Sequence, residues 1–473
     1  MKRIVLAFGL LLPAATAVVL FQWLRGPSVR PNVLLITVDT LRADHLGVYG
    51  YDRRTSPNLD GLAREGVVFE NAFTHASLSG PSHATIMTSL YPPTHGVTMN
   101  GVKVSKDHLT LAEVLRASGY ETGMFVSHGA VSGWFGFAQG FDWSRRYHVD
   151  SHRHHHAGEP EPSAALAEVF DAALEWISEP RDRPFFVWLH AQHPHKSYEP
   201  PEPFDRKFRE PPQSSHDLRC SHTLGAHDAE KITLNADELD YVIALYDGEI
   251  AYVDDQLGRI LTRLREPGLE RETVVLLTAD HGEMLFDDAE RREQGHAAFA
   301  LDPVLRVPLI VRDVGRRGAG RRVVSHVGLI DVAPTILDLV GVEEPDVFAG
   351  TSLVPLWKRE VEIRPRHYAF TSSGKLSDLR HRLTVRTSRM KLICRMKRAD
   401  PDCRLFDLEL DPGEHGDRSD DPNYAEEQER LQTALFEWFR SNVELRRLRE
   451  LKPFDERTRE LLRRAGYLQE DEE

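Results

Sequence analysis

Residues Ser77 to Gly96 read SLSGPSHATIMTSLYPPTHG, a short helix signal enclosed between prolines. Pro81 suits the first position of a helix, because its fixed φ matches helical geometry and no hydrogen bond is lost there. Tyr91-Pro92-Pro93 would end a helix, so the spacing predicts a short helix over residues 82–90. Ser79 would then stand just before the N-terminus of that helix.

The environment predicted for Ser79 suits the chemistry of tetrahedral oxyanions. Free N–H groups and the positive end of the helix dipole favour sulfate or phosphate groups at that place. A serine hydroxyl held there beside a cation could act as a nucleophile. The alternative interpretation is that Ser79, Gly80 and Ser82 are ordinary capping residues.

Two apolar runs elsewhere in the chain are each followed by an acid. Val33 to Ile36 is continuous and apolar, which is typical of a strand covered on both faces of a parallel sheet, and Asp39 follows it. A second run, residues 273–278, precedes Asp280 and His281. Ligand sites in doubly wound α/β folds lie beyond the carboxyl ends of strands. With Ser79, these residues predict a site for one divalent cation, although each acid alone is also typical of a turn.

Histidines follow a third strand signal. The buried run 184–189 is followed by His190, His193 and His195, a group that packing alone does not explain. A further histidine, His296, precedes a strand-like run over residues 307–311. Imidazole exchanges protons near neutral pH, so His195 and His296 are candidates for acid catalysis.

Composition limits the class of partner. The chain has 473 residues, and 73 acidic side chains outnumber 59 basic ones, for a formal net charge of −14. This charge argues against a general nucleic-acid binder.

The first 30 residues contain an apolar run from Ile4 to Leu24 behind Lys2 and Arg3. Twenty-one residues suffice to cross a bilayer, so we expect a membrane anchor, with a cleaved signal peptide ending near Ala17 as the alternative. Either outcome exports the remainder to the periplasm or cell surface.

The chain contains three cysteines. Cys394 and Cys403 could form a disulfide in an oxidising compartment, which would leave Cys220 over. Three unpaired thiols are the alternative.

The stretch Ser79-Gly80-Pro81-Ser82-His83 resembles the C/S-x-P-S-R signature of the sulfatase family, within the alkaline-phosphatase-like superfamily. The resemblance implies that Ser79 occupies the position oxidised to formylglycine, by a formylglycine-generating maturase, and that His83 replaces the arginine beside it. Unmodified Ser79, as in related phosphatase-like enzymes, stays open.

Other motifs resemble the family in the same order. Residues 190–201 are similar to H-x-x-D-P-H-x-P-Y-x-P-P, so His195 matches a histidine of the substrate pocket, while His193 replaces the aspartate. Asp39, Asp280 and His281 match metal-binding positions. His296 stands where related enzymes place a histidine or lysine near the leaving group. Where many members carry G-K-x-H, this chain has Ser127-His128 without the lysine.

The resemblance implies an α/β fold in which helices sandwich a large mixed, mostly parallel sheet. We expect a catalytic domain over residues 31–360, a smaller C-terminal α+β subdomain with a short antiparallel sheet over 361–445, and a charged tail over 446–473. Short strand signals after residue 365 and a helix over 424–444 support the subdomain.

The expected function is a metal-dependent sulfuric ester hydrolase acting on a small-molecule or glycan sulfate ester. The catalytic candidates are Ser79, His83, His195 and His296; the metal ligands are Asp39, Asp280, His281 and Ser79. Calcium is implied by the family, whereas the imidazole of His281 opens manganese, zinc or magnesium. Alternatives are a phosphodiesterase, phosphonate ester hydrolase or phospho-group transferase with unmodified Ser79, and a catalytically silent binding protein.

We predict that the full-length protein fractionates with membranes and that deletion of residues 1–30 releases it, because the apolar run is the expected anchor. The measurement is immunodetection in membrane and soluble fractions. Full-length protein found soluble in the cytoplasm would contradict this prediction.

Overall fold

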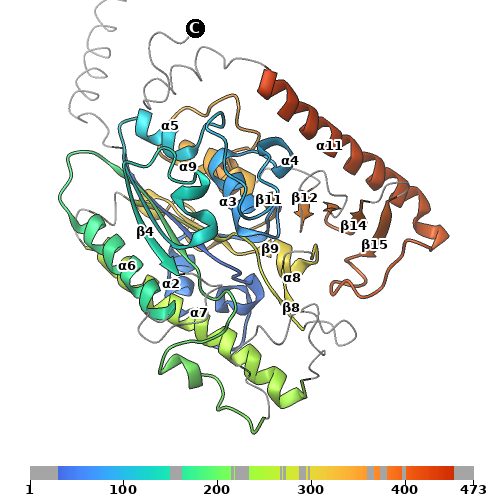
Figure 1. Cartoon of the computed structure of the whole chain (residues 1–473), viewed down its shortest axis with the longest axis horizontal. Helices are drawn as coiled ribbons and strands as arrows, with labels where there is room; N and C mark the ends of the chain where they lie inside the picture. Colours follow the sequence, from blue (N-terminus) through green and yellow to red (C-terminus); the bar gives the residue numbers. More distant parts are fainter. Residues whose placement is uncertain are drawn as a thin grey trace, which may run out of the picture.

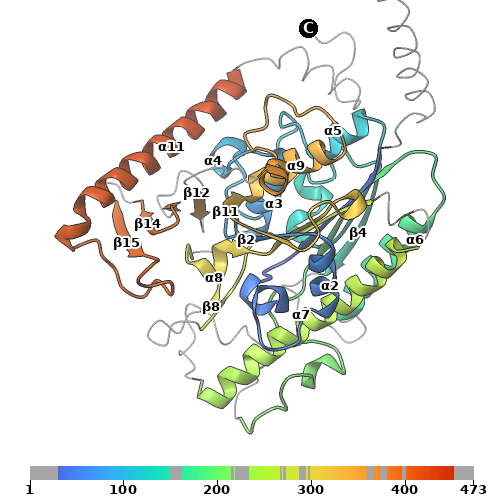
Figure 2. The same cartoon turned by 180° about the vertical axis from the view of Figure 1, so that it is seen from behind.

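The protein forms a three-layered α/β unit and a smaller C-terminal unit, in which one long helix lies beside a second sheet (Figures 1 and 2). The α/β unit places its large sheet between two layers of helices. This arrangement confirms the predicted fold class. The computed structural model describes residues 30–149, 162–214, 218, 234–266, 269, 273–286, 294–296, 299–359, 367–372, 381–396 and 401–451.

The large sheet has nine strands in the order β11-β2-β10-β6-β1-β5-β3-β4, with β9 paired to β2. Five pairings are parallel and three, those of β10 and β9, are antiparallel. Every residue of β1, β5 and β6 is buried, as expected for central strands covered on both faces. The strands are β1 Asn32–Val38, β2 Val67–Phe73, β3 Glu121–His128, β4 Trp143–Val149, β5 Phe185–Ala191, β6 Thr273–Ala279, β9 Arg306–Val307, β10 Leu309–Arg312 and β11 Arg321–Gly328.

Helices cover both faces of this sheet (Figures 1 and 2). One layer contains α2 Pro57–Glu65, α6 Pro162–Ser178 and α7 Ala236–Leu264. The other contains α3 Ser79–Thr88, α5 Leu111–Ala117 and α9 Val332–Leu339. Asn235 and Glu238 form a capping box that satisfies free N–H groups at the start of α7. The remaining short elements are α4 Pro92–His95, α8 Asp302–Leu305, α10 Val354–Arg359, β7 Met284–Leu285 and β8 Gln294–Gly295.

The C-terminal unit is an antiparallel sheet of four strands, in chain order, covered by α11 Ala425–Leu451. Leu431 and Leu435 of α11 are buried in its apolar core. Cys394 and Cys403 lie opposite each other on neighbouring strands and form a disulfide, which was one of the two alternatives left open by the sequence. The strands are β12 His367–Ser372, β13 His381–Arg386, β14 Met390–Arg395 and β15 Asp402–Asp407.

Buried ion pairs join the two units. Lys391 of β14 is almost fully buried, and its Nζ lies 2.8 Å from Asp302 of α8 and 2.5 Å from Glu414. Arg386 of β13 pairs with the same Asp302 carboxylate. Removing one partner of such a buried group leaves an uncompensated charge, so these contacts hold the C-terminal sheet against the α/β unit.

Two predicted helix boundaries were wrong. Helix α3 begins at Ser79 instead of residue 82, so Ser79 is its first residue and Pro81 lies inside its first turn. Proline is tolerated there because N–H groups of the first turn have no intrahelical partner. Helix α11 runs to Leu451, so six residues of the predicted charged tail are helical.

Several predictions fall outside the described residues. They include residues 1–29 of the expected anchor, Cys220, residues 452–473 of the tail and the boundary at residue 360. Among the described residues, no helix is both long and apolar enough to span a bilayer.

His95 of α4 supports α3 through its ring. The Val97 N–H donates to His95 Nδ1 at 3.1 Å, so the ring proton resides on Nε2, which donates to Thr85 of α3 at 3.1 Å. Burial lowers the pKa of His95 well below its ordinary value, and His108 adds to the decrease. Protonation would place a second N–H against the Val97 donor.

We predict that acid destabilises the protein partly through His95. The unfolded chain takes up a proton near pH ~6.5 and the folded chain does not, so stability is present above ~6.5 and is lost as the pH falls. Thermal unfolding midpoints of wild type and His95→Gln, measured from pH 7.5 to 5, should fall less steeply for the variant, which cannot titrate. Equal slopes would contradict this prediction.

Candidate functional site

The site lies where four neighbouring parallel strands end. Strands β6, β1, β5 and β3 are consecutive in the sheet, so their carboxyl ends share one edge. Asp280 follows β6, Asp39 follows β1, His195 follows β5 and His128 ends β3. Residues that are far apart in the sequence therefore meet at one place, as expected for an α/β fold.

Ser79 faces this edge from the first position of α3 and is buried. Its Oγ lies 3.4 Å from Asp39 Oδ2 and 3.5 Å from His281 Nε2. The next N–H, that of Gly80, donates to Asn100 Oδ1 at 2.8 Å. Asn100 was not predicted, because a lone asparagine in a loop carries no sequence signal. The structure thus brings the predicted nucleophile and two predicted metal ligands together.

The donor atoms fit a divalent cation. Asp39 Oδ1 and Asp280 Oδ2 are fully buried and have no hydrogen-bond partner within the described part of the chain. His281 Nδ1 donates to the Gly282 carbonyl at 2.9 Å, which leaves the Nε2 lone pair free, 3.5 Å from Asp280 Oδ2. A ring N–H held by a carbonyl is typical of metal-binding histidines. Asp39, Ser79, Asp280 and His281 are therefore the residues that would hold the ion.

The carboxyl groups of Asp39 and Asp280 repel each other when both are ionised. Burial raises the pKa of Asp39 well above its ordinary value, and the nearby Asp280 adds to the increase. Burial acts in the same direction on Asp280, but the surrounding histidines, His281 foremost, outweigh it and hold the pKa of Asp280 below its ordinary value. A divalent cation would relieve this repulsion, because buried like charges are costly without a counter-ion.

A row of histidines continues from the metal-ligand group. The ring centroids of His281 and His296 are 4.4 Å apart, and those of His296 and His195 are 5.3 Å apart. His296 Nδ1 lies 3.2 Å from the buried carboxylate of Glu283, a residue that was not predicted. His195 Nδ1 donates to the Lys196 carbonyl at 2.8 Å. The structure therefore places both candidate acids in one row with the predicted metal ligand His281.

His83 lies one turn along α3 from Ser79. Its Nδ1 donates to the Ser79 carbonyl at 2.8 Å and lies 3.8 Å from Asp280 Oδ2, while Nε2 contacts the hydroxyl of Thr37 at 3.1 Å. Burial lowers the pKa of His83 to about 4. These contacts show how a neutral His83 can orient Ser79, and its catalytic role stays a prediction.

Three more buried histidines, His128, His190 and His195, are held in the neutral form as well. Burial lowers the pKa of His128 to about 4 and that of His195 well below its ordinary value. His190, inside β5, is affected in the same way. At neutral pH these rings therefore contribute lone pairs and N–H donors, not positive charge.

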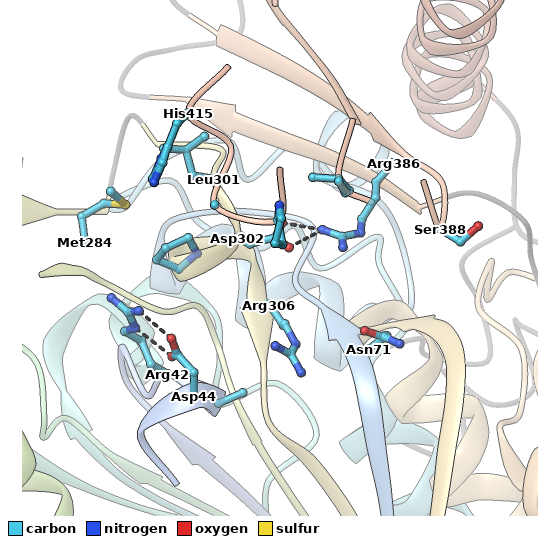
Figure 3. Close-up of a pocket in the computed structure, with 15 residues that line it drawn as sticks. Arg42, Asp44, Asn71, Met284, Leu301, Asp302, Arg306, Arg386, Ser388 and His415 are labelled. Carbon is cyan, nitrogen blue, oxygen red and sulfur yellow. Dashed lines mark hydrogen bonds and ion pairs between the residues drawn. The ribbon is translucent and has the colours of Figure 1, made fainter. Parts of the chain in front are cut away.

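A cavity of about 480 Å³ opens between the α/β unit and the C-terminal sheet (Figure 3). Arg306 projects toward it between two ion pairs, Arg42 with Asp44 and Arg386 with Asp302. Among the described residues that line it, none is a predicted site residue. Arg42 connects this cavity with the candidate site, because its Nη1 donates to the carbonyl of Glu283.

We predict that Asp280→Ala loses the ion held with Asp39, Ser79 and His281, because half of the buried negative charge is removed. Elemental analysis of purified, dialysed protein measures this, with Asp44→Ala, an acid outside the group, as the matched control. Wild-type metal content in both Asp39→Ala and Asp280→Ala would rule the site out.

Known proteins share this architecture. The solved structure of a phosphonate monoester hydrolase from Agrobacterium radiobacter superposes with a TM-score of 0.73 at 25% identity, covering 88% of this chain and 96% of that one. The multifunctional alkaline phosphatase superfamily protein PehA of Trinickia caryophylli is 28% identical over 84% of this chain and 92% of its own length. An arylsulfatase of Clostridium perfringens is 26% identical over 86% and 94%.

Family models cover most of the described chain. Residues 31–342 match the model described as Sulfatase. Residues 296–441 match the C-terminal model of N-sulphoglucosamine sulphohydrolase. With the alkaline-phosphatase-like fold and the gathered site residues, these matches show that the chain belongs to the sulfatase family and is a sulfatase-like hydrolase.

Proposed function

We propose that the protein is a metal-dependent sulfuric ester hydrolase with the side chain of residue 79 as its nucleophile. The observation that carries the proposal is the position of Ser79 Oγ, within 3.5 Å of both Asp39 and His281 at the start of a helix. A bound cation would lower the pKa of the hydroxyl and neutralise charge on the nonbridging oxygens of the ester. The positive end of the α3 dipole, at Ser79, favours the same negatively charged oxygens.

In the proposed reaction, Ser79 Oγ forms a bond to sulfur while the bond from sulfur to the alcohol oxygen breaks. His296 is the better-placed acid for the departing alcohol, because its Nδ1 faces Glu283 and Nε2 remains for the substrate. His195 donates from Nδ1 to a carbonyl, which leaves a lone pair on Nε2. That lone pair suits the later step, in which a base accepts a proton from the water that releases sulfate.

The charge of the site favours a singly charged ester. His83, His128 and His195 are neutral at pH 7 because burial lowers the pKa of each ring. Among the described residues no lysine or arginine pairs with Asp39 or Asp280. One divalent ion balances those two carboxylates and leaves little excess positive charge. A sulfate monoester carries one negative charge, so it suits this site better than a dianionic phosphate monoester.

Residue 79 is proposed to act either as serine or as formylglycine. Formylglycine requires a maturase that reads the S-x-P-S-H stretch, in which His83 replaces arginine. Mass spectrometry of the peptide that contains residue 79 distinguishes the two forms. An intact serine would favour the second candidate function, hydrolysis of phosphonate esters or phosphodiesters.

The metal is proposed from the donor set. Two carboxylates, one hydroxyl and one imidazole suit manganese or zinc, because imidazole favours these ions over calcium. Calcium and magnesium are the alternatives, since oxygen donors are in the majority.

Phosphonate ester or phosphodiester hydrolysis is the second candidate. The similarity to the Agrobacterium radiobacter phosphonate monoester hydrolase favours it, and these esters also carry a single charge. A panel of aryl sulfate, phosphonate monoester and phosphate diester substrates separates the two functions by their kcat/KM values.

We also propose that the enzyme acts outside the cytoplasm, held by its N-terminal segment. The apolar run over residues 4–24 supports this location, and so does the disulfide between Cys394 and Cys403, since such bonds persist in oxidising compartments. A small-molecule or glycan sulfate ester is then the expected substrate.

We predict that Ser79→Ala lowers kcat on the best substrate of the panel by at least about a thousandfold, on the order of 4 kcal/mol, because the attacking oxygen is removed. Thr88→Val is the matched control: it lies on the same helix, and its hydroxyl donates only to the carbonyl of Ala84. The control should keep activity within a few fold. Turnover by Ser79→Ala near that of wild type would exclude the covalent mechanism.

A further inference from the structure

Two buried histidine nitrogens without hydrogen-bond partners in the described chain adjoin the ligand set described above. His128 Nδ1 lies 3.0 Å from Asp39 Oδ2, and His190 Nε2 lies 3.9 Å from the same oxygen. Neither ring nitrogen has a hydrogen-bond partner among the described residues, and both side chains are at least nine-tenths buried. Unsatisfied buried polar atoms are rare in folded proteins and require an explanation.

The protonation of His190 follows from its surroundings. Its Nδ1 lies 2.9 Å from the Thr37 hydroxyl and 3.2 Å from the Thr37 carbonyl. The hydroxyl donates its one proton to His83 Nε2, and the carbonyl can only accept, so the ring proton of His190 resides on Nδ1. Nε2 therefore presents a lone pair to Asp39, where an ordinary hydrogen bond is impossible. A lone pair facing a carboxylate, with the opposite N–H bound to a carbonyl, is the arrangement of a metal-binding histidine.

The spacing of the donor atoms fits a cation. Ligand atoms around a tetrahedral zinc ion at ~2.0–2.1 Å are separated by about 3.3 Å. The two measured separations, 3.0 and 3.9 Å, bracket this value. Two imidazoles and one carboxylate are a donor set of zinc sites that keep their fourth position open. Asp39 has a second oxygen, Oδ1, without a hydrogen-bond partner in the described chain, so one carboxylate can serve two ions.

We propose that Asp39, His128 and His190 hold a second divalent cation of the zinc class, next to the ion of Asp39, Ser79, Asp280 and His281. Two-metal sites that share a carboxylate have ions about 3.5–4 Å apart. The proposal deepens the proposed function, because the second ion would face the same ester, but it concerns binding of metal and is tested without turnover.

The test is the stoichiometry of Zn²⁺. Protein stripped with a chelator is reloaded with Zn²⁺, dialysed and measured by elemental analysis. The segment 150–160, outside the described residues, contains four histidines that could bind zinc. All proteins in the test therefore carry serine at those positions, His152, His154, His155 and His156.

The variants are His128→Ala and His190→Gln, with His193→Gln as the matched control. His193 lies two residues beyond the end of β5, the strand that contains His190. Its Nδ1 contacts Glu249, so His193 belongs to neither of the two proposed metal-ligand groups. We expect about two Zn²⁺ per chain in the background protein and the control, and about one in each variant. Circular dichroism and thermal unfolding check that each variant is folded.

One Zn²⁺ per chain in the background protein overturns the proposal, whatever the variants do. Two ions retained in both folded variants overturn it as well. If a variant does not fold, His128→Asn, a smaller change at the same ring position, replaces it. If the protein binds two ions but cleaves no sulfate ester, the proposed function is contradicted and this inference stands. If it cleaves a sulfate ester with one ion bound, this inference is contradicted and the proposed function stands.

Discussion

The repulsion between Asp39 and Asp280 is the constraint on which the site depends. Both carboxyl groups are fully buried at the ends of neighbouring strands, where water cannot screen them. A fold can hold two such groups only with a counter-ion, a shared proton or strong donors nearby. The structure surrounds them with the start of α3 and with buried histidines, which are groups suited to binding a cation and an anion together.

Helix α3 is the second element of this arrangement. All ten of its residues are buried, so its position is set by packing and by polar contacts along its length. Ser82 donates to the carbonyl of Asp280 at 2.7 Å, and His83 contacts the carbonyl of Ser79. The capping role considered for Ser82 is therefore replaced by a contact that ties the helix to the end of β6. The proposed nucleophile Ser79 and the proposed metal ligand Asp280 are thus tied together through α3.

The C-terminal unit stabilises this edge from outside. Lys391 and Arg386 reach Asp302, and the carbonyl of Val304 in the same short helix accepts from the Gly282 N–H, two residues after Asp280. A Cβ at Gly282 would lie 2.0 Å from the Pro303 carbonyl, so only glycine permits this approach. The two units thus support the metal ligands through direct contacts.

The sequence by itself determined the strands that deliver Asp39 and Asp280, because their apolar runs and the acids after them are local features. Through short motifs it also indicated the fold class, which the structure confirms, and marked Ser79 as the candidate nucleophile. Only the tertiary structure revealed the contacts of Asn100 with Gly80 and of Glu283 with His296, which no local period or spacing marks. The sequence singled out His190 with its neighbours, but not its place beside Asp39, which comes from a distant segment. The start of α3 was misjudged for a related reason: burial against the sheet extends the helix over Ser79 and Gly80, although local propensity favours a start at Pro81.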